Sequence, residues 1–116
     1  MRIAGPALAL LVLTGAGSAR AGESLAEVRL RLFQFQPARL EVVTDARVIW
    51  INDDQIAHTV TAGTPERPGG GPNVRLPERG ARAEWQFHEA GVFPIFCARH
   101  PHMQAEIVVT PGRRQR

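Results

Sequence analysis

The sequence contains almost no cysteine and no lysine or tyrosine at all. Its one cysteine is Cys97. One cysteine cannot form a disulfide within the chain, although small exported domains often depend on such bonds. A lone thiol in an oxidising compartment is open to oxidation unless something occupies it, and a metal ion is one such occupant. A buried, inert thiol is the alternative interpretation of the same residue.

A strong charge of one sign is also absent. The fourteen basic residues are all arginine, and eleven acidic residues stand against them. No basic stripe with interleaved aromatic residues occurs, so a nucleic-acid partner is not expected. Several of the arginines lie in the basic tail, residues 111–116, which we expect to be disordered.

The beginning of the chain lacks the apolar length that a membrane span requires. Arg2 precedes an apolar run over residues 3–13, which is shorter than the roughly 20 residues of a spanning helix. Small residues come next and end in an Ala-Arg-Ala triplet, which fits the small-x-small pattern of signal peptidase sites. We predict a signal peptide over residues 1–21, cleaved after Ala21 or, as second choice, after Ala19. The protein would then be periplasmic or otherwise exported, with no integral membrane segment; an uncleaved anchor is the alternative.

Short alternating runs separated by turn residues fill the rest of the chain, where no convincing helical period occurs. This pattern predicts one all-β domain over residues 22–110, a two-sheet antiparallel sandwich of about seven to eight strands. Residues 63–80, rich in glycine and proline, are expected to form a long loop. Trp50 could fall on either side of its strand. The faces expected to meet in the core are those of Val28, Leu30 and Leu32 and of Ile49 and Ile51.

The most informative stretch offers three metal-binding side chains in one short segment. Cys97, His100 and Met103 follow one another at a spacing of three. Soft sulfur ligands combined with imidazole favour copper, and two histidines, one cysteine and a weak axial methionine form the blue-copper set. The second histidine must then come from elsewhere in the chain. His58 is the best candidate, because it follows a strand and a turn.

Each of these residues also has a plainer interpretation. His58 alone would more often be a turn or surface residue, and Met103 could simply pack in the core. His102 competes with His100, but the two point in opposite directions if the chain is extended. His88 has no partner at a useful spacing and is expected on the surface. The Asp53-Asp54 pair could be acid–base machinery, but turn chemistry explains it more simply.

Three segments are informative together: Val48-Ile49-Trp50-Ile51-Asn52-Asp53-Asp54, His58-Thr59-Val60 and Gly91-Val92-Phe93-Pro94-Ile95-Phe96-Cys97-Ala98-Arg99-His100-Pro101-His102-Met103. Together they resemble the cupredoxins. The ligand loop, with proline directly after its histidine, looks most like that of amicyanin within the plastocyanin and amicyanin group. The resemblance implies an eight-stranded Greek-key sandwich with one type 1 copper ion at one end. It also implies His58, Cys97 and His100 as equatorial ligands and Met103 as the axial ligand.

The sequence departs from that family at three positions. Phe93 stands where the family usually has tyrosine, so the hydroxyl that would tie down this corner is missing. Thr59 follows the first histidine and Gln104 follows the methionine, in place of the amide or glycine residues that are common there. These replacements affect hydrogen bonding around the ligands, on which the reduction potential depends.

The function expected from these observations is single-electron transfer by copper that cycles between Cu(I) and Cu(II). Donor and acceptor would be periplasmic redox proteins that dock transiently on a monomer. No enzyme is expected, because four protein ligands fill the metal and no oxyanion or substrate-pocket signature accompanies the cysteine. The alternative function is periplasmic copper storage or delivery, which the same ligands would serve. A binding module with a vestigial site is a further alternative.

Overall fold

Alternating apolar and polar residues place most of the chain in strands. This computed structural model describes residues 24–112; the predicted signal peptide, residues 1–21, and the end of the predicted tail, residues 113–116, lie outside them. Nine strands form within the described part, and no helix there could cross a membrane. In chain order they are β1 (Leu25–Arg31), β2 (Gln34–Gln36), β3 (Arg39–Val43), β4 (Arg47–Asn52), β5 (His58–Gly63), β6 (Pro68–Leu76), β7 (Arg82–Gln86), β8 (Gly91–Phe96) and β9 (Gln104–Thr110).

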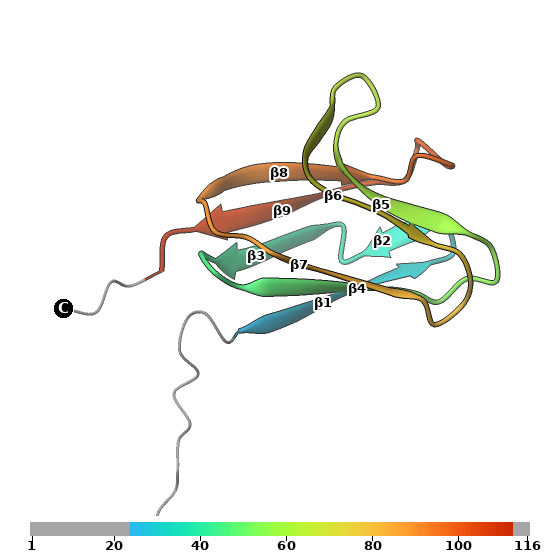
Figure 1. The fold of residues 1–116 in the computed structure, drawn as a ribbon, viewed down its shortest axis with the longest axis horizontal. Helices are drawn as coiled ribbons and strands as arrows, with labels where there is room; N and C mark the ends of the chain where they lie inside the picture. Colours follow the sequence, from blue (N-terminus) through green and yellow to red (C-terminus); the bar gives the residue numbers. More distant parts are fainter. Residues whose placement is uncertain (1–23, 113–116) are drawn as a thin grey trace, which may run out of the picture.

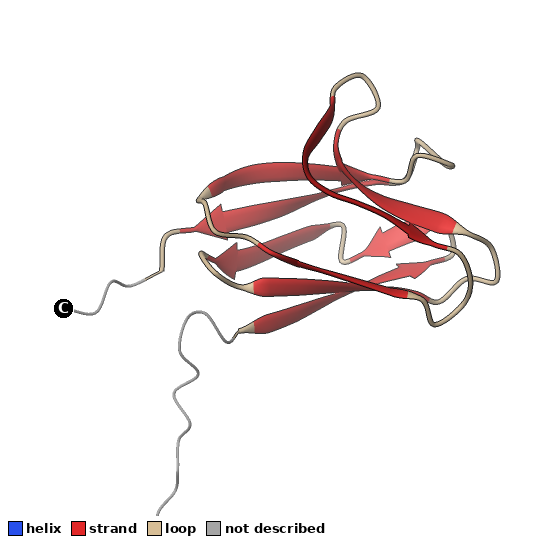
Figure 2. Cartoon of the chain, in the orientation of Figure 1, coloured by secondary structure: helices blue, strands red, loops and turns tan. Residues whose placement is uncertain are grey.

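The strands form two sheets that face each other (Figures 1 and 2). One sheet has the order β2-β1-β4-β7 and the other the order β3-β9-β8-β5-β6. The predicted all-β sandwich is confirmed, but both sheets are mixed, since β1 pairs with β4 and β3 pairs with β9 in parallel. Pro37 follows β2 directly and has no N–H to continue its ladder. The chain then begins β3 in the opposite sheet, against β9.

The prediction of a long loop over residues 63–80 is wrong, because β6 lies within this segment. This strand pairs antiparallel with β5, and the resulting hairpin stands out from the body of the sandwich (Figure 1). β6 lies at the edge of its sheet, where proline and glycine interrupt fewer ladder bonds. The hairpin turns over residues 64–67, directly after Gly63, whose φ is +96° and whose position has no room for a Cβ beside the carbonyl of Arg67.

The core lies between the sheets and is only partly the one predicted. Val28 and Leu30 are buried in the core cluster as expected, but Leu32 is 71% exposed because it lies in the turn after β1. The predicted face of Ile49 and Ile51 is wrong: Ile51 is buried but lies outside that cluster, to which β4 contributes Val48 and Trp50. In β4, Val48 and Trp50 are fully buried whereas Ile49 is only half-buried. The indole N–H of Trp50 has no hydrogen-bond partner among the described residues.

Candidate metal centre

Cys97 lies directly after β8, at the end of a strand in the middle of its sheet. Its side chain is completely buried. The seven-residue loop that follows closes on itself, because the Cys97 amide donates to the Met103 carbonyl at 3.1 Å and the Met103 amide donates to the His100 carbonyl at 2.8 Å. The His100 amide in turn donates to the Cys97 carbonyl at 3.2 Å. These bonds fold the spacing of three into a compact loop.

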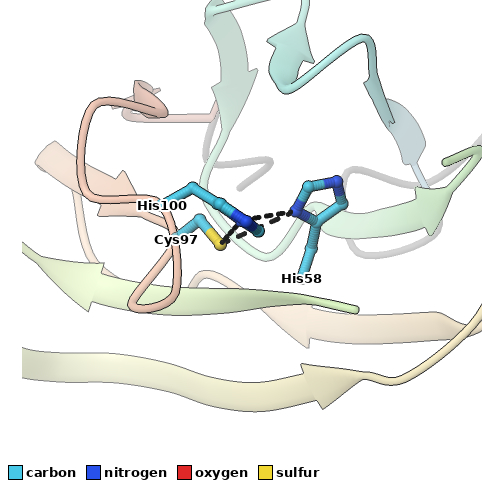
Figure 3. A group of neighbouring side chains, drawn as sticks. All are labelled: His58, Cys97 and His100. Atoms are coloured by element: carbon cyan, nitrogen blue, oxygen red, sulfur yellow. Dashed lines mark hydrogen bonds between the residues drawn. The ribbon is translucent and has the colours of Figure 1, made fainter. Parts of the chain in front are cut away.

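His58 reaches the same place from the neighbouring strand. It begins β5, which pairs with β8 so that Thr61 lies opposite Phe96, the residue before Cys97. The Nδ1 atom of His58 lies 3.8 Å from the Cys97 sulfur, and that of His100 lies 3.5 Å from it. The two Nδ1 atoms are 3.2 Å apart. Figure 3 shows the two imidazoles and the sulfur converging on one point.

This convergence fits a single metal ion. The donor atoms of His58, Cys97 and His100 all lie within 4.8 Å of one another. An ion with bonds of about 2.0–2.3 Å to nitrogen and sulfur has donor-to-donor distances of about 3.5 Å, close to those observed. A thiolate with two imidazoles is the trigonal set typical of blue-copper sites. The three donor atoms are therefore already arranged to bind one metal ion.

The other predicted residues divide into those near this group and those outside it. Met103 is buried in the same core cluster as Cys97, so it is available from the loop; its axial role stays a prediction. His102 is exposed, with its ring centre 6.3 Å from that of His100, and it does not join the three donors. His88 is exposed as expected and bonds Asp45 through Nδ1 at 2.9 Å.

Asp54 orients the ring of His58, a role that sequence reasoning missed. Its Oδ2 lies 2.7 Å from Nε2 of His58, so Nε2–H donates to the carboxylate and leaves the Nδ1 lone pair facing Cys97. Desolvation alone would raise the pKa of Asp54, but the hydrogen bonds from His58 and from the backbone amides of Phe33 and Leu32 lower it below its usual value. Asp54 therefore does more than terminate a turn; its position four residues before His58 was the available signal.

His100 is the donor nearest to solvent, since its side chain is half-buried whereas His58 and Cys97 are fully buried. Desolvation lowers the pKa of His100, and the positive charges that His58, His102 and Arg99 can carry lower it further, opposed by Asp54. The neutral imidazole is therefore favoured, and this is the form that binds a metal ion.

The three departures from the cupredoxin pattern all have visible contacts. The Thr59 amide donates to the Cys97 sulfur at 3.4 Å, and its hydroxyl accepts from the Ala98 amide at 2.7 Å. Gln104 donates to the carbonyl of Pro101 at 3.1 Å, which braces the ligand loop. Phe93 packs against Phe87 with ring centres 5.2 Å apart.

Comparison with known proteins gives a result only at the level of structure. No protein-family model and no curated protein sequence matches the chain. A purple cupredoxin from Nitrosopumilus maritimus superposes with a TM-score of 0.67 and 23% identity, over 73% of this chain and 99% of that one. Two amicyanin mutants, both described in the Cu(I) form, superpose with TM-scores of 0.62 and 0.63. They are 24% and 25% identical and cover 73% and 74% of this chain and 81% and 82% of theirs.

The chain has the cupredoxin fold. The resemblance seen in the sequence is thereby confirmed for the fold, and the donor group lies where its motifs predicted, with His58 on one strand and Cys97 and His100 on the loop after another. Phe33, like Asp54, lies beside the donor group although the sequence analysis did not predict it there. Its ring is roughly perpendicular to both imidazoles, with its centre 5.5 Å from the ring centre of His58 and 5.0 Å from that of His100.

Proposed function

We propose that this chain is a type 1 copper protein that carries single electrons and is not an enzyme. His58, Cys97 and His100 would be the equatorial ligands and Met103 the axial ligand. The observation that carries the proposal is the preformed triangle of two Nδ1 atoms and one sulfur, with separations of 3.2, 3.5 and 3.8 Å. Bound copper would supply the one-electron Cu(I)/Cu(II) couple.

The chain's own residues supply rigidity. His58 and Cys97 begin or follow neighbouring strands and have no exposed surface, so the protein fixes their positions before any metal binds. Asp54 fixes the tautomer of His58, and Thr59 donates a hydrogen bond to the sulfur. A ligand set that moves little between oxidation states favours fast electron transfer. Amicyanin structures similar in fold are described in the reduced and in the oxidised state, which supports a one-electron couple for this fold.

Electrons would enter and leave through His100. It is the only one of the three donors with exposed surface, and apolar side chains surround this end of the sandwich, with Leu32 71%, Phe33 40% and Ile56 39% exposed. A small apolar surface suits transient docking by redox partners. We propose that these partners are periplasmic proteins and that the protein acts as an exported monomer after removal of residues 1–21.

Copper storage or delivery is the weaker alternative. Delivery requires a metal that a partner can reach and extract by replacing its ligands. Here two of the three donors are wholly buried; His58 begins β5 and Cys97 directly follows β8, so exchange would be slow. No feature of the described residues favours delivery over electron transfer.

The test is the visible spectrum of the mature domain loaded with Cu(II). We expect an intense thiolate-to-copper charge-transfer band and its complete loss in Cys97→Ser. His102→Ala is the matched control, because His102 lies on the same loop but outside the donor group, and it should keep the band. A wild-type domain that binds Cu(II) without this band would contradict the proposal.

A further inference from the structure

The tight turn between β1 and β2 has an unusual sequence. Arg31 pairs with Gln34, so Leu32 and Phe33 alone form the loop of this hairpin. Their φ angles are +54° and +56°, which places both in the left-handed region. Two-residue hairpin loops of this kind strongly prefer Asn-Gly or similar pairs, because residues with larger side chains are strained there. A leucine followed by a phenylalanine in this turn requires a reason.

Asp54 holds the strained turn in place. Its Oδ1 accepts from the Leu32 amide at 2.8 Å, and its Oδ2 accepts from the Phe33 amide at 3.1 Å. The same Oδ2 binds Nε2 of His58 at 2.7 Å. One carboxylate therefore ties the turn and the buried histidine together. Backbone strain of this kind persists where surrounding contacts over-determine it, and it gathers at functional sites.

The turn places the ring of Phe33 against both imidazoles. The interplanar angles are 88° with His58 and 89° with His100, an edge-to-face arrangement with each. Such contacts contribute beyond simple burial and have a defined geometry. Leu32, the other residue of the turn, is 71% exposed. The strain thus places one aromatic ring where it meets the two histidines of the donor group.

We propose that Phe33 is a positioning residue, an aromatic clamp that holds His58 and His100 in register for the metal and keeps water and small ligands away from it. This inference rests on the proposed function. The clamp matters most for His100, because that residue lies on a loop and is the donor nearest to solvent. Asp54 and the turn hold the Phe33 ring in this position, and the strained backbone at Leu32 and Phe33 destabilises the fold in return.

Two glycine substitutions separate the clamp from the turn that carries it. Leu32→Gly and Phe33→Gly each relieve one strained residue, so both should raise or maintain the thermal unfolding midpoint of the metal-free domain. Only Phe33→Gly removes the ring. We expect it to speed copper release to a chelator at least tenfold and to let added imidazole alter the charge-transfer band, whereas Leu32→Gly stays within twofold of wild type in both assays.

A second pair of variants covers the case in which a glycine variant does not fold. Phe33→Tyr keeps the ring and should release copper at the wild-type rate, whereas Phe33→Leu keeps the apolar bulk and the turn but should release it at least threefold faster. In the metal-free domain, the imidazole NMR shifts of His58 and His100 should move in Phe33→Leu and not in Leu32→Gly. Unchanged shifts together with wild-type release in the ring-less variants would overturn the clamp.

The two proposals fail in different ways. A wild-type domain without the charge-transfer band would overturn the copper function, while the NMR comparison on the metal-free domain would still test the clamp. A normal band that is insensitive to loss of the Phe33 ring would overturn the clamp and leave the copper function standing.

Discussion

The carboxylate of Asp54 lies 2.7 Å from Nε2 of His58, while Nδ1 of the same ring lies 3.8 Å from the sulfur of Cys97. The Nε2 nitrogen of this buried imidazole is thus held by a carboxylate, so that the Nδ1 nitrogen is free to bind a metal ion. Hydrogen bonds of this type set the tautomer of a ligand histidine and raise its basicity. The relationship also joins the donor group to the β1–β2 hairpin, which supplies none of the three donors.

The first prediction concerns this acid. Asp54→Ala removes the acceptor of Nε2–H, so His58 can adopt the tautomer that places the proton on Nδ1. Loss of such a partner commonly costs a site about 10- to 100-fold in metal affinity. Copper affinity measured by competition with a chelator should fall by that amount. Asp53→Ala is the matched control, because Asp53 pairs with Arg29 instead, at 2.9 Å, and wild-type affinity is expected there.

The second prediction concerns the hydroxyl of Thr59. Thr59→Val keeps the amide that donates to the Cys97 sulfur but leaves the Ala98 amide without its acceptor and removes the bond to the Thr61 hydroxyl. Loss of these two bonds should lower the free energy of unfolding by about 1–3 kcal/mol, measured by urea denaturation of the metal-free domain. The loosened loop should also shift the charge-transfer maximum of the copper form. Thr59→Ser retains the hydroxyl and should behave as wild type; equal losses in both variants would contradict this account.

The third prediction concerns the stabilising effect of the metal. An ion that binds only the folded domain stabilises it in proportion to the logarithm of its concentration over Kd, about 4 kcal/mol at 1,000 times Kd. Loading with copper should therefore raise the unfolding midpoint, and removal by a chelator should reverse the change. Cys97→Ser should show little of this rise. A rise of the same size in that variant would indicate that copper stabilises the domain from another site.

The fourth prediction concerns the largest buried side chain. Trp50→Ala should cost about 3–5 kcal/mol, as is usual when a buried aromatic ring is removed. Trp50→Phe should cost less than half as much, because it keeps a ring in the core and removes an indole N–H that has no partner among the described residues. Trp85, which is 40% exposed, remains as the fluorescence probe of unfolding in both variants. Equal losses in the two variants would show that ring volume is not what Trp50 contributes.

Local patterns predicted much of this structure. Alternation in β1 placed Val28 and Leu30 in the core, and the spacing of three from Cys97 to His100 predicted two of the three donor side chains that the structure brings together. These features depend on neighbours in the chain, so a sequence displays them directly. The choice of His100 over His102 came from the resemblance to the cupredoxins, and the structure places His100 in the donor group.

The features that escaped prediction depend on residues far apart in the chain. Leu32 continues the alternation of β1, yet it turns outward because Asp54 holds its amide from 22 positions away. The contact of Phe33 with both imidazoles has the same origin. β6 was hidden because glycine and proline suggest a loop, whereas pairing with β5 gives them a strand at the edge of the sheet. Parallel pairing of β1 with β4 likewise depends on the whole topology.

The composition of β6 has a consequence for how copies of this protein meet. An edge strand presents unpaired amide and carbonyl groups, which invite a second molecule to extend the sheet and so begin aggregation. Pro68 and Pro72 deny that ladder two of its donors, and the three glycines between them offer no side chains to zip together. This edge, whose composition resembles that of an unstructured loop, is thus a poor template for sheet growth, and copies of the domain are expected to stay separate at high concentration.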